Sequence, residues 1–144
     1  EYYSQRQRRA QVEALRALHA EAAGQAAAPA AGKESNPAFA ARPRPASALV
    51  CGDFNCEPDS AEHRLMQAPI APDVPAWCDA WRVLAPGAPH APSVGLHGAE
   101  WPDRAYCCDF FFVTADLAPR VRALQVLAET AASDHQPVVL ELDD

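Results

Sequence analysis

The chain has 144 residues, a length typical of one domain, with 19 acidic and 12 basic residues and a formal net charge of −7. This acidic balance argues against broad nucleic-acid binding, in which Lys and Arg contacts to phosphate supply most of the affinity. No run approaches the ~20 apolar residues that cross a bilayer. Five cysteines without a C-x-x-C pair disfavour a disulfide framework and a four-ligand zinc site, so we expect a cytoplasmic protein with reduced thiols.

The chain opens with a pattern typical of an amphipathic helix. Between about Tyr3 and Ala22, apolar residues recur at three- and four-residue steps, as at Val12 and Leu15. The following residues, 23–47, are rich in Ala and Pro, and their X-Pro steps disfavour helix. We interpret this stretch as a flexible insertion.

Order is expected to return at a short apolar run, Ala48 to Cys51, which ends at Gly52. Such a run predicts a buried central strand that opens into a turn. The sequence from Asp59 to Glu62 is a D-x-x-E capping box and predicts the start of a helix. Three β-favouring runs close the chain, at residues 110–114, 121–127 and 138–142.

Three short segments place carboxylates, an amide and an imidazole beside predicted strands. They are Gly52-Asp53-Phe54-Asn55, Cys108-Asp109-Phe110 and Ser133-Asp134-His135. Side chains at strand ends are held by the sheet and still face solvent, so we expect Asn55, Asp109 and His135 to converge within one hydrogen-bonded shell. Phosphoester hydrolysis needs this mixture, because carboxylates hold a divalent cation, a base positions water and donors stabilise the phosphate oxygens.

The order and spacing of these motifs resemble the C-terminal half of the endonuclease/exonuclease/phosphatase superfamily, the fold of DNase I. In that family a G-D-x-N turn, a later Asp at the head of an aromatic strand and a terminal S-D-H-x-P-V follow one another. The resemblance covers nearly all of residues 1–144 apart from 23–47. It implies an α/β fold, a two-sheet β-sandwich flanked by helices, to which this chain contributes mainly one sheet as the C-terminal part of one domain.

The resemblance also implies a role for each motif residue. Asp53 would orient or deprotonate the attacking water near the metal, and Asn55 would donate its amide to the phosphate. Asp109 would fix the tautomer of His135, whose other ring nitrogen would contact a phosphate oxygen or act as a base. Asp134 would join Asp53 in holding Mg²⁺ or Mn²⁺, which prefer oxygen ligands.

Residues 69–105 hold half of the chain's prolines and predict long connections around short helical turns. Within them, His97 and Arg104 are candidate substrate contacts, and Trp101 either contacts substrate or packs the loop onto the sheet. His63, on the predicted helix, is interpreted as an exposed polar position.

The function expected is metal-dependent phosphoester hydrolysis, with phosphodiester cleavage of the nuclease type ahead of phosphomonoester removal from a small molecule or lipid. The partner is then a phosphoester, possibly a nucleic acid, although the Cys107-Cys108 pair, where many relatives have Arg and an aliphatic residue, argues against DNA. A rival interpretation is an inactive fragment or interaction module, because the family's N-terminal half, expected upstream, supplies further active-site residues. A serine-hydrolase triad at Ser133-Asp134-His135 is disfavoured, since consecutive residues cannot align as nucleophile, base and orienter.

Overall fold

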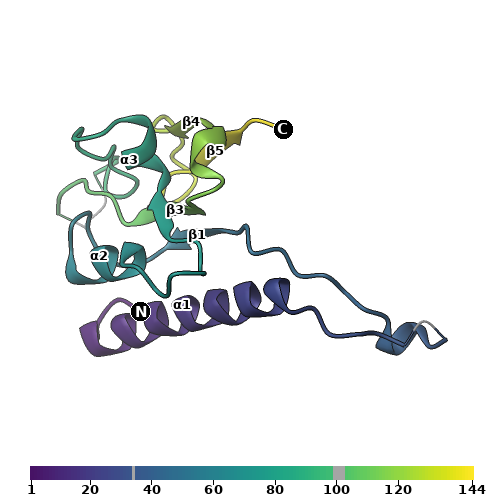
Figure 1. The fold of residues 1–144 in the computed structure, drawn as a ribbon. Helices are drawn as coiled ribbons and strands as arrows, with labels where there is room; N and C mark the ends of the chain where they lie inside the picture. Colours follow the sequence, from purple (N-terminus) through teal and green to yellow (C-terminus); the bar gives the residue numbers. More distant parts are fainter. Residues whose placement is uncertain (34, 99–102) are drawn as a thin grey trace.

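The computed structural model describes residues 1–33, 35–98 and 103–144 and has a mixed α/β architecture (Figure 1). The helices are α1 (Gln5–Ala27), η1 (Pro37–Phe39), α2 (Ala61–Gln67), α3 (Ala80–Leu84) and η2 (Ala118–Arg120). The strands are β1 (Leu49–Asp53), β2 (Trp77–Asp79), β3 (Asp109–Thr114), β4 (Val121–Val126) and β5 (Val138–Leu142). Within these described ranges, no helix has the length and apolar character needed to cross a membrane.

The strands form two antiparallel sheets, a three-stranded one in the order β1-β3-β2 and a two-stranded one of β4 and β5. The prediction that the run ending at Cys51 is a buried central strand is wrong, because β1 is an edge strand whose residues are exposed except for half-buried Val50. The central position belongs to β3, which pairs on both sides and buries Phe112 completely. Strand pairing, which the apolar run alone does not encode, decides which strand is central.

Helix α1 begins after Ser4, whose hydroxyl accepts a hydrogen bond from the Gln7 backbone N–H at 3.3 Å. The helix continues to Ala27, beyond the expected end at Ala22, because alanine is the strongest helix former. It stops shortly before Pro29, whose ring disfavours helix in the residue before it. The first residues of the predicted insertion, 23–27, therefore belong to α1.

Two side chains of α1 attach the helix to the rest of the fold. The Arg16 guanidinium donates to the carbonyl oxygens of Leu65 at 2.8 Å and Pro69 at 3.0 Å, at the C-terminal end of α2 where carbonyls lack helical partners. His19 is buried, with its Nε2 2.8 Å from the Pro75 carbonyl oxygen. Together these contacts hold α1 against α2 and the strand that follows it.

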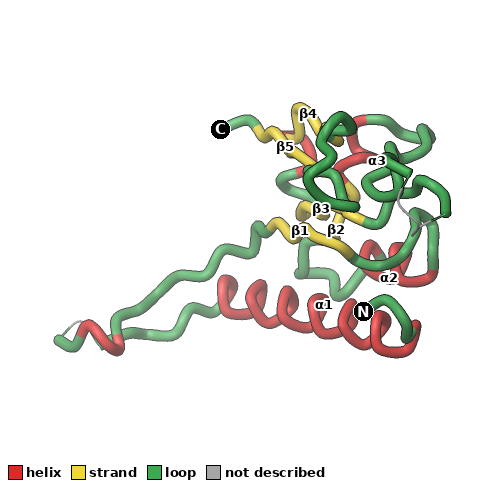
Figure 2. The backbone as a smooth tube through the Cα atoms, turned by 180° about the vertical axis from the view of Figure 1, so that it is seen from behind, coloured by secondary structure: helices red, strands yellow, loops and turns green. Residues whose placement is uncertain are grey.

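Residues 28–33 and 35–48 form an arm that leaves the end of α1, extends away from the body and returns to β1 (Figures 1 and 2). In this arm, Asn36 caps η1 by accepting a hydrogen bond from the Ala38 backbone N–H at 3.0 Å. The arm corresponds to most of the predicted insertion and contacts the sheet where β1 begins.

Helix α2 begins one residue later than the capping box predicts. Its N-cap is Ser60, whose hydroxyl accepts from the His63 backbone N–H at 3.2 Å. Asp59 has a φ of 62°, a left-handed conformation that differs from the extended one of an N-cap residue. The Asp59 carboxylate instead pairs with Arg82 at 2.7 Å, so it links α2 to α3.

Two apolar clusters hold β3 in place. The first joins α1 and α2 to one face of the three-stranded sheet and includes Met66, Phe110 and Phe112. The second packs Val113 against Val121 and the α3 region on the other face. Because successive side chains of a strand point to opposite faces, β3 is anchored from both sides, and this fixes the position of its first residue, an aspartate.

Candidate active site

The turn after β1 carries the first two predicted site residues. Asp53 is the last residue of β1 and pairs in register with Asp109, the first residue of β3. Asn55 adopts a φ of 50°, a conformation that Asn tolerates better than most residues. Its backbone N–H donates to Asp53 Oδ1 at 2.7 Å and its side-chain Nδ2 donates to Asp53 Oδ2 at 2.8 Å. The Asp53 carboxylate is therefore oriented by both hydrogen bonds from Asn55.

The Asp109 carboxylate is the centre of a hydrogen-bond network. Its Oδ2 accepts from the Ser93 hydroxyl at 2.6 Å and lies 2.9 Å from His135 Nδ1. The Ser93 oxygen in turn accepts from the backbone N–H groups of Cys108 at 3.2 Å and Asp109 at 3.3 Å. Fully buried Ser93, which the sequence analysis missed, thus fixes Asp109 through both its side chain and its backbone.

The hydrogen bond expected between Asp109 and His135 is present, and it brings the loop before β5 to the start of β3. The backbone around His135 is held by a bridge to Val94 and by the Gln136 N–H, which donates to the Ser93 carbonyl at 2.8 Å. Because Asp109 accepts from Nδ1, the proton of the neutral imidazole lies on Nδ1 and Nε2 carries the lone pair. The His135 side chain is 34% exposed, so solvent can reach the ring.

Charge around the ring raises the pKa of His135 above its ordinary value. Burial alone would lower this pKa, but the hydrogen bond and charge of Asp109 outweigh burial, and the charges of Asp53 and Asp134 act in the same direction. Asp134 is exposed, and its Oδ1 accepts from the Ser133 hydroxyl at 3.1 Å. Both carboxylates predicted to hold metal therefore lie near enough to His135 to influence its protonation.

The chemistry of these donors fits Mg²⁺ or Mn²⁺. Such ions are usually held by one or two carboxylates, with water and substrate phosphate completing the coordination. Asp53 and Asp134 both carry exposed carboxylates, and the charges of both act on the pKa of His135. They are the two residues that the family resemblance would assign to a hard divalent cation.

Two neighbouring thiols lie immediately before Asp109, and both are buried. Burial, followed by the charge of Asp109, raises the pKa of Cys107 to about 12. Burial and the nearby carboxylates of Asp109 and Asp53 raise the pKa of Cys108 even further. Both thiols are therefore protonated at neutral pH, and neither is an activated nucleophile.

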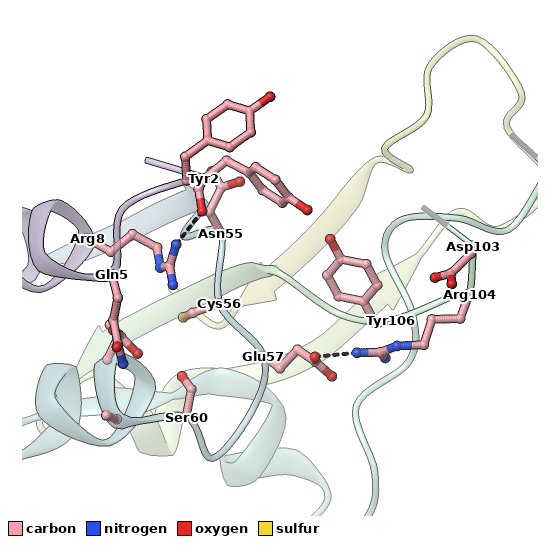
Figure 3. Close-up of a pocket in the computed structure, with 13 residues that line it drawn as sticks. Tyr2, Gln5, Arg8, Asn55, Cys56, Glu57, Ser60, Asp103, Arg104 and Tyr106 are labelled. Atoms are coloured by element: carbon pink, nitrogen blue, oxygen red, sulfur yellow. Dashed lines mark hydrogen bonds and ion pairs between the residues drawn. The ribbon is translucent and has the colours of Figure 1, made fainter. Parts of the chain in front are cut away.

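A pocket of about 580 Å³ opens beside Asn55 and is drawn in Figure 3. Arg104 lies on its wall, where its guanidinium forms an ion pair with Glu57 and sits 5.0 Å from the centre of the Tyr106 ring. Arg8 lines the same pocket and donates to the Tyr2 carbonyl oxygen. Of the predicted substrate contacts, Arg104 therefore shares a pocket with Asn55.

The other candidates in this loop lie elsewhere. His97 is exposed and is not among the residues that line the pocket beside Asn55. Trp101 lies outside the described residues. The structure therefore does not bring His97 together with Asn55 and Arg104.

A second carboxylate–histidine cluster, absent from the sequence analysis, lies in the interior. Asp79 Oδ2 is 2.9 Å from His63 Nε2 and 2.6 Å from His90 Nε2, while Asp79 Oδ1 accepts from the Trp81 backbone N–H at 2.9 Å. Burial alone would raise the pKa of Asp79, but the two histidines outweigh it and hold this pKa well below its usual range. The interpretation of His63 as an exposed position is wrong, because only 2% of its side chain is exposed.

The fold places a carboxylate-oriented imidazole, Asp109–His135, and the Asp53–Asn55 turn at the ends of the paired strands β1 and β3. Comparison with protein families makes the assignment more specific, because residues 5–135 match the Endonuclease/Exonuclease/phosphatase family. The chain belongs to this family, whose members are generally metal-dependent phosphoester hydrolases. A search of curated proteins finds no match to the chain.

Proposed function

We propose that this chain carries the catalytic centre of a Mg²⁺- or Mn²⁺-dependent phosphodiesterase of the nuclease type. The observation that carries the proposal is the 2.9 Å contact between Asp109 and His135, which lies beside the Asp53–Asn55 turn on the paired strands β1 and β3. A fixed carboxylate, an amide donor and an oriented imidazole near the ends of paired strands are the groups that phosphoester hydrolysis requires.

In this proposal, Asp109 holds His135 with its proton on Nδ1, so that Nε2 can accept a proton from water or contact a phosphate oxygen. Asn55 uses one N–H of its amide on Asp53, and the second N–H remains to donate to phosphate. Asp53 orients the attacking water. The internal hydrogen bonds support the first two roles, and the role of Asp53 is proposed from the family resemblance.

Asp53 and Asp134 are the residues proposed to hold the metal. When bound, a divalent cation would offset the charge of the phosphate and polarise its oxygen atoms. The raised pKa of His135 reflects the negative charge that collects at this point, which is also what attracts a cation.

The pocket beside Asn55 supports a substrate with a group beyond the reacting phosphate. Arg8, Arg104 and the Tyr106 ring line it together with three acidic residues, and Arg104 is paired with one of these, Glu57. A nucleotide neighbour could use Arg8 and the aromatic ring, because phosphate pairs with Arg and bases stack on aromatic rings. On these two groups we base the preference for a phosphodiester in nucleic acid over a phosphomonoester of a small molecule or lipid.

We also propose that further active-site residues lie upstream of Glu1, so that this chain is the C-terminal part of a two-sheet sandwich. The edge position of β1 supports this, as do Leu49, which is 40% exposed, and Leu18 on α1, which is 61% exposed. An apolar groove runs between α1 and β1 and would be covered by further strands. A cytoplasmic location is proposed because buried free thiols suit a reducing compartment.

The deciding experiment measures hydrolysis of a panel of phosphodiesters and phosphomonoesters with Mg²⁺ and with Mn²⁺. Both the full-length gene product and the 144-residue chain are assayed. We expect the full-length protein to cleave nucleic-acid phosphodiesters only with metal, and the 144-residue chain to cleave little.

Each of three other outcomes would change the proposal. Cleavage of monoesters alone would reassign the substrate class. The absence of hydrolysis across the whole panel would favour an interaction module. Robust turnover by the short chain would contradict the upstream contribution.

A further inference from the structure

A sulfur atom lies among the donor atoms of the proposed catalytic centre. Cys108 Sγ, a carboxylate oxygen of Asp109 and a ring nitrogen of His135 all lie within 4.8 Å of one another. The Cys108 sulfur is 3.6 Å from Asp109 Oδ2, which is itself 2.9 Å from His135 Nδ1. The charge of the nearby Asp53 carboxylate also acts on this thiol.

This donor set differs from the one that Mg²⁺ selects. Thiolate, imidazole and carboxylate together are typical of Zn²⁺, which binds four ligands in a tetrahedron, whereas Mg²⁺ takes oxygen ligands. Zn²⁺ bonds to sulfur and nitrogen are about 2.3 and 2.0 Å long, so donors about 3–4 Å apart can share one ion. The observed separations require only small side-chain movements to reach that geometry.

The three donors are also firmly supported. Cys108 is 2% exposed, and its backbone N–H donates to the Ser93 hydroxyl oxygen at 3.2 Å. The same hydroxyl donates to Asp109 at 2.6 Å, and the Ser93 carbonyl holds the backbone beside His135. Ser93 therefore fixes all three ligand-bearing segments, and such supporting contacts are what orient metal ligands in proteins.

We propose that Cys108, Asp109 and His135 form a binding site for a thiophilic divalent cation, Zn²⁺, with Asp53 or water as the fourth ligand. On binding, the Cys108 S–H bond breaks, a sulfur–zinc bond forms and the thiol proton passes to solvent. His135 binds through Nδ1 as the neutral imidazole, with its proton on Nε2. The geometry of the site would therefore permit Zn²⁺ to bind, and only other cations that compete for the same ligands would prevent it.

The regulatory consequence rests on the proposed function. Zinc at this site would occupy Asp109 and His135 Nδ1 and place the ring proton on Nε2, the atom proposed to accept a proton during hydrolysis. Zn²⁺ should therefore inhibit hydrolysis that is supported by Mg²⁺ or Mn²⁺. Binding itself does not depend on catalysis and can be tested without a substrate.

Co²⁺ is the probe for the first test, because a cobalt–thiolate bond gives a charge-transfer absorption band that carboxylate and imidazole ligands do not give. We expect the protein, reduced and free of metal, to develop this band at one equivalent of Co²⁺ and to lose it when Zn²⁺ is added. The His63–Asp79–His90 cluster has no sulfur, so cobalt bound there would be silent in this band.

The variants assign the band to one thiol. Cys108→Ser should abolish it, while Cys51→Ser, which removes an exposed thiol of β1, should leave it unchanged. His135→Ala keeps the buried thiol and should weaken Co²⁺ binding by about tenfold or more. Circular dichroism and thermal unfolding of each variant verify that it is folded.

A band that survives in folded Cys108→Ser, disappears in Cys51→Ser or never forms in the parent protein would overturn the proposal. If Cys108→Ser does not fold, unchanged Co²⁺ affinity in His135→Ala would overturn it instead. The outcomes remain separable from the proposed function. Metal-dependent hydrolysis without a band rejects only the zinc site, and a Cys108-dependent band without hydrolysis rejects only the phosphodiesterase.

Discussion

Two clusters in this protein combine aspartate with histidine, and they differ mainly in access to solvent. At the start of the central strand β3, the side chains of Asp109 and His135 are 16% and 34% exposed. In the interior, those of Asp79, His63 and His90 are 1%, 2% and 3% exposed. The comparison indicates that an oriented imidazole can act on a substrate only where a ring nitrogen is accessible, whereas the same groups in the core hold segments together.

The largest effect is expected at the accessible cluster. His135→Ala should reduce hydrolysis by the full-length protein by about a hundredfold or more, because the proposed proton acceptor is lost. His97→Ala, which removes an exposed histidine outside the pocket, is the matched control and should retain activity. Steady-state kinetics checks both variants, and an unchanged rate for His135→Ala would remove this residue from the mechanism.

Asp53→Asn should lower turnover by about the same factor of a hundred, because it removes the carboxylate proposed to orient water and hold metal. The change keeps the size of the side chain, so the thermal unfolding midpoint should move little. Asp73→Asn, in an exposed loop, serves as the control. Activity that survives in Asp53→Asn would reassign the turn after β1 to a structural role.

A substitution in the buried cluster should change the free energy of unfolding. Asp79→Ala is expected to lower the free energy of unfolding by about 2–4 kcal/mol, because it leaves the buried N–H groups of two histidines without an acceptor. Asp73→Ala should change it by less than about 0.5 kcal/mol. Urea unfolding measures both, and a small loss for Asp79→Ala would mean that the interior histidines find other partners.

The smallest effects are the pH dependences, which have opposite signs in the two clusters. The raised pKa of His135 implies stabilisation that is complete below its unfolded value of 6.5 and is lost as pH rises through the folded pKa. The lowered pKa of Asp79 implies stabilisation that is present above 3.8 and is lost as pH falls further.

An NMR titration of His135 tests the first of these directly. The pKa of this histidine should lie above 6.5 in the parent protein and should fall in Asp109→Asn, because the charge and the hydrogen-bonding carboxylate of Asp109 are lost. A titration that is identical in the two proteins would contradict the assignment of the shift to Asp109.

The sequence predicted the accessible cluster because its residues belong to motifs at the ends of apolar runs. Asp53, Asp109 and His135 each stand beside a strand, and a strand end fixes where a side chain points. Ser93 could not be found in this way, since a lone serine in a proline-rich loop carries no periodic signal. Its role depends on a contact with a residue 16 positions away, which only the folded chain creates.

The same limit explains the errors in the fold. The predicted start of α2 is one residue too early, because Asp59 and Ser60 are both good N-cap residues and the backbone conformation decides between them. Strand β2 was missed because its short run, Trp77–Asp79, lies among prolines and is specified by pairing with β3. Local patterns predicted the longer elements, and non-local pairing determined the rest.

The arm described above joins two elements that are each held to the body independently, α1 through Arg16 and His19 and β1 through β3. The entropy of closing a loop grows only slowly with its length. Extra residues at the tip should therefore cost little and leave the Asp53 turn in place. The arm is the natural point at which to splice a fluorescent reporter or affinity tag into this protein.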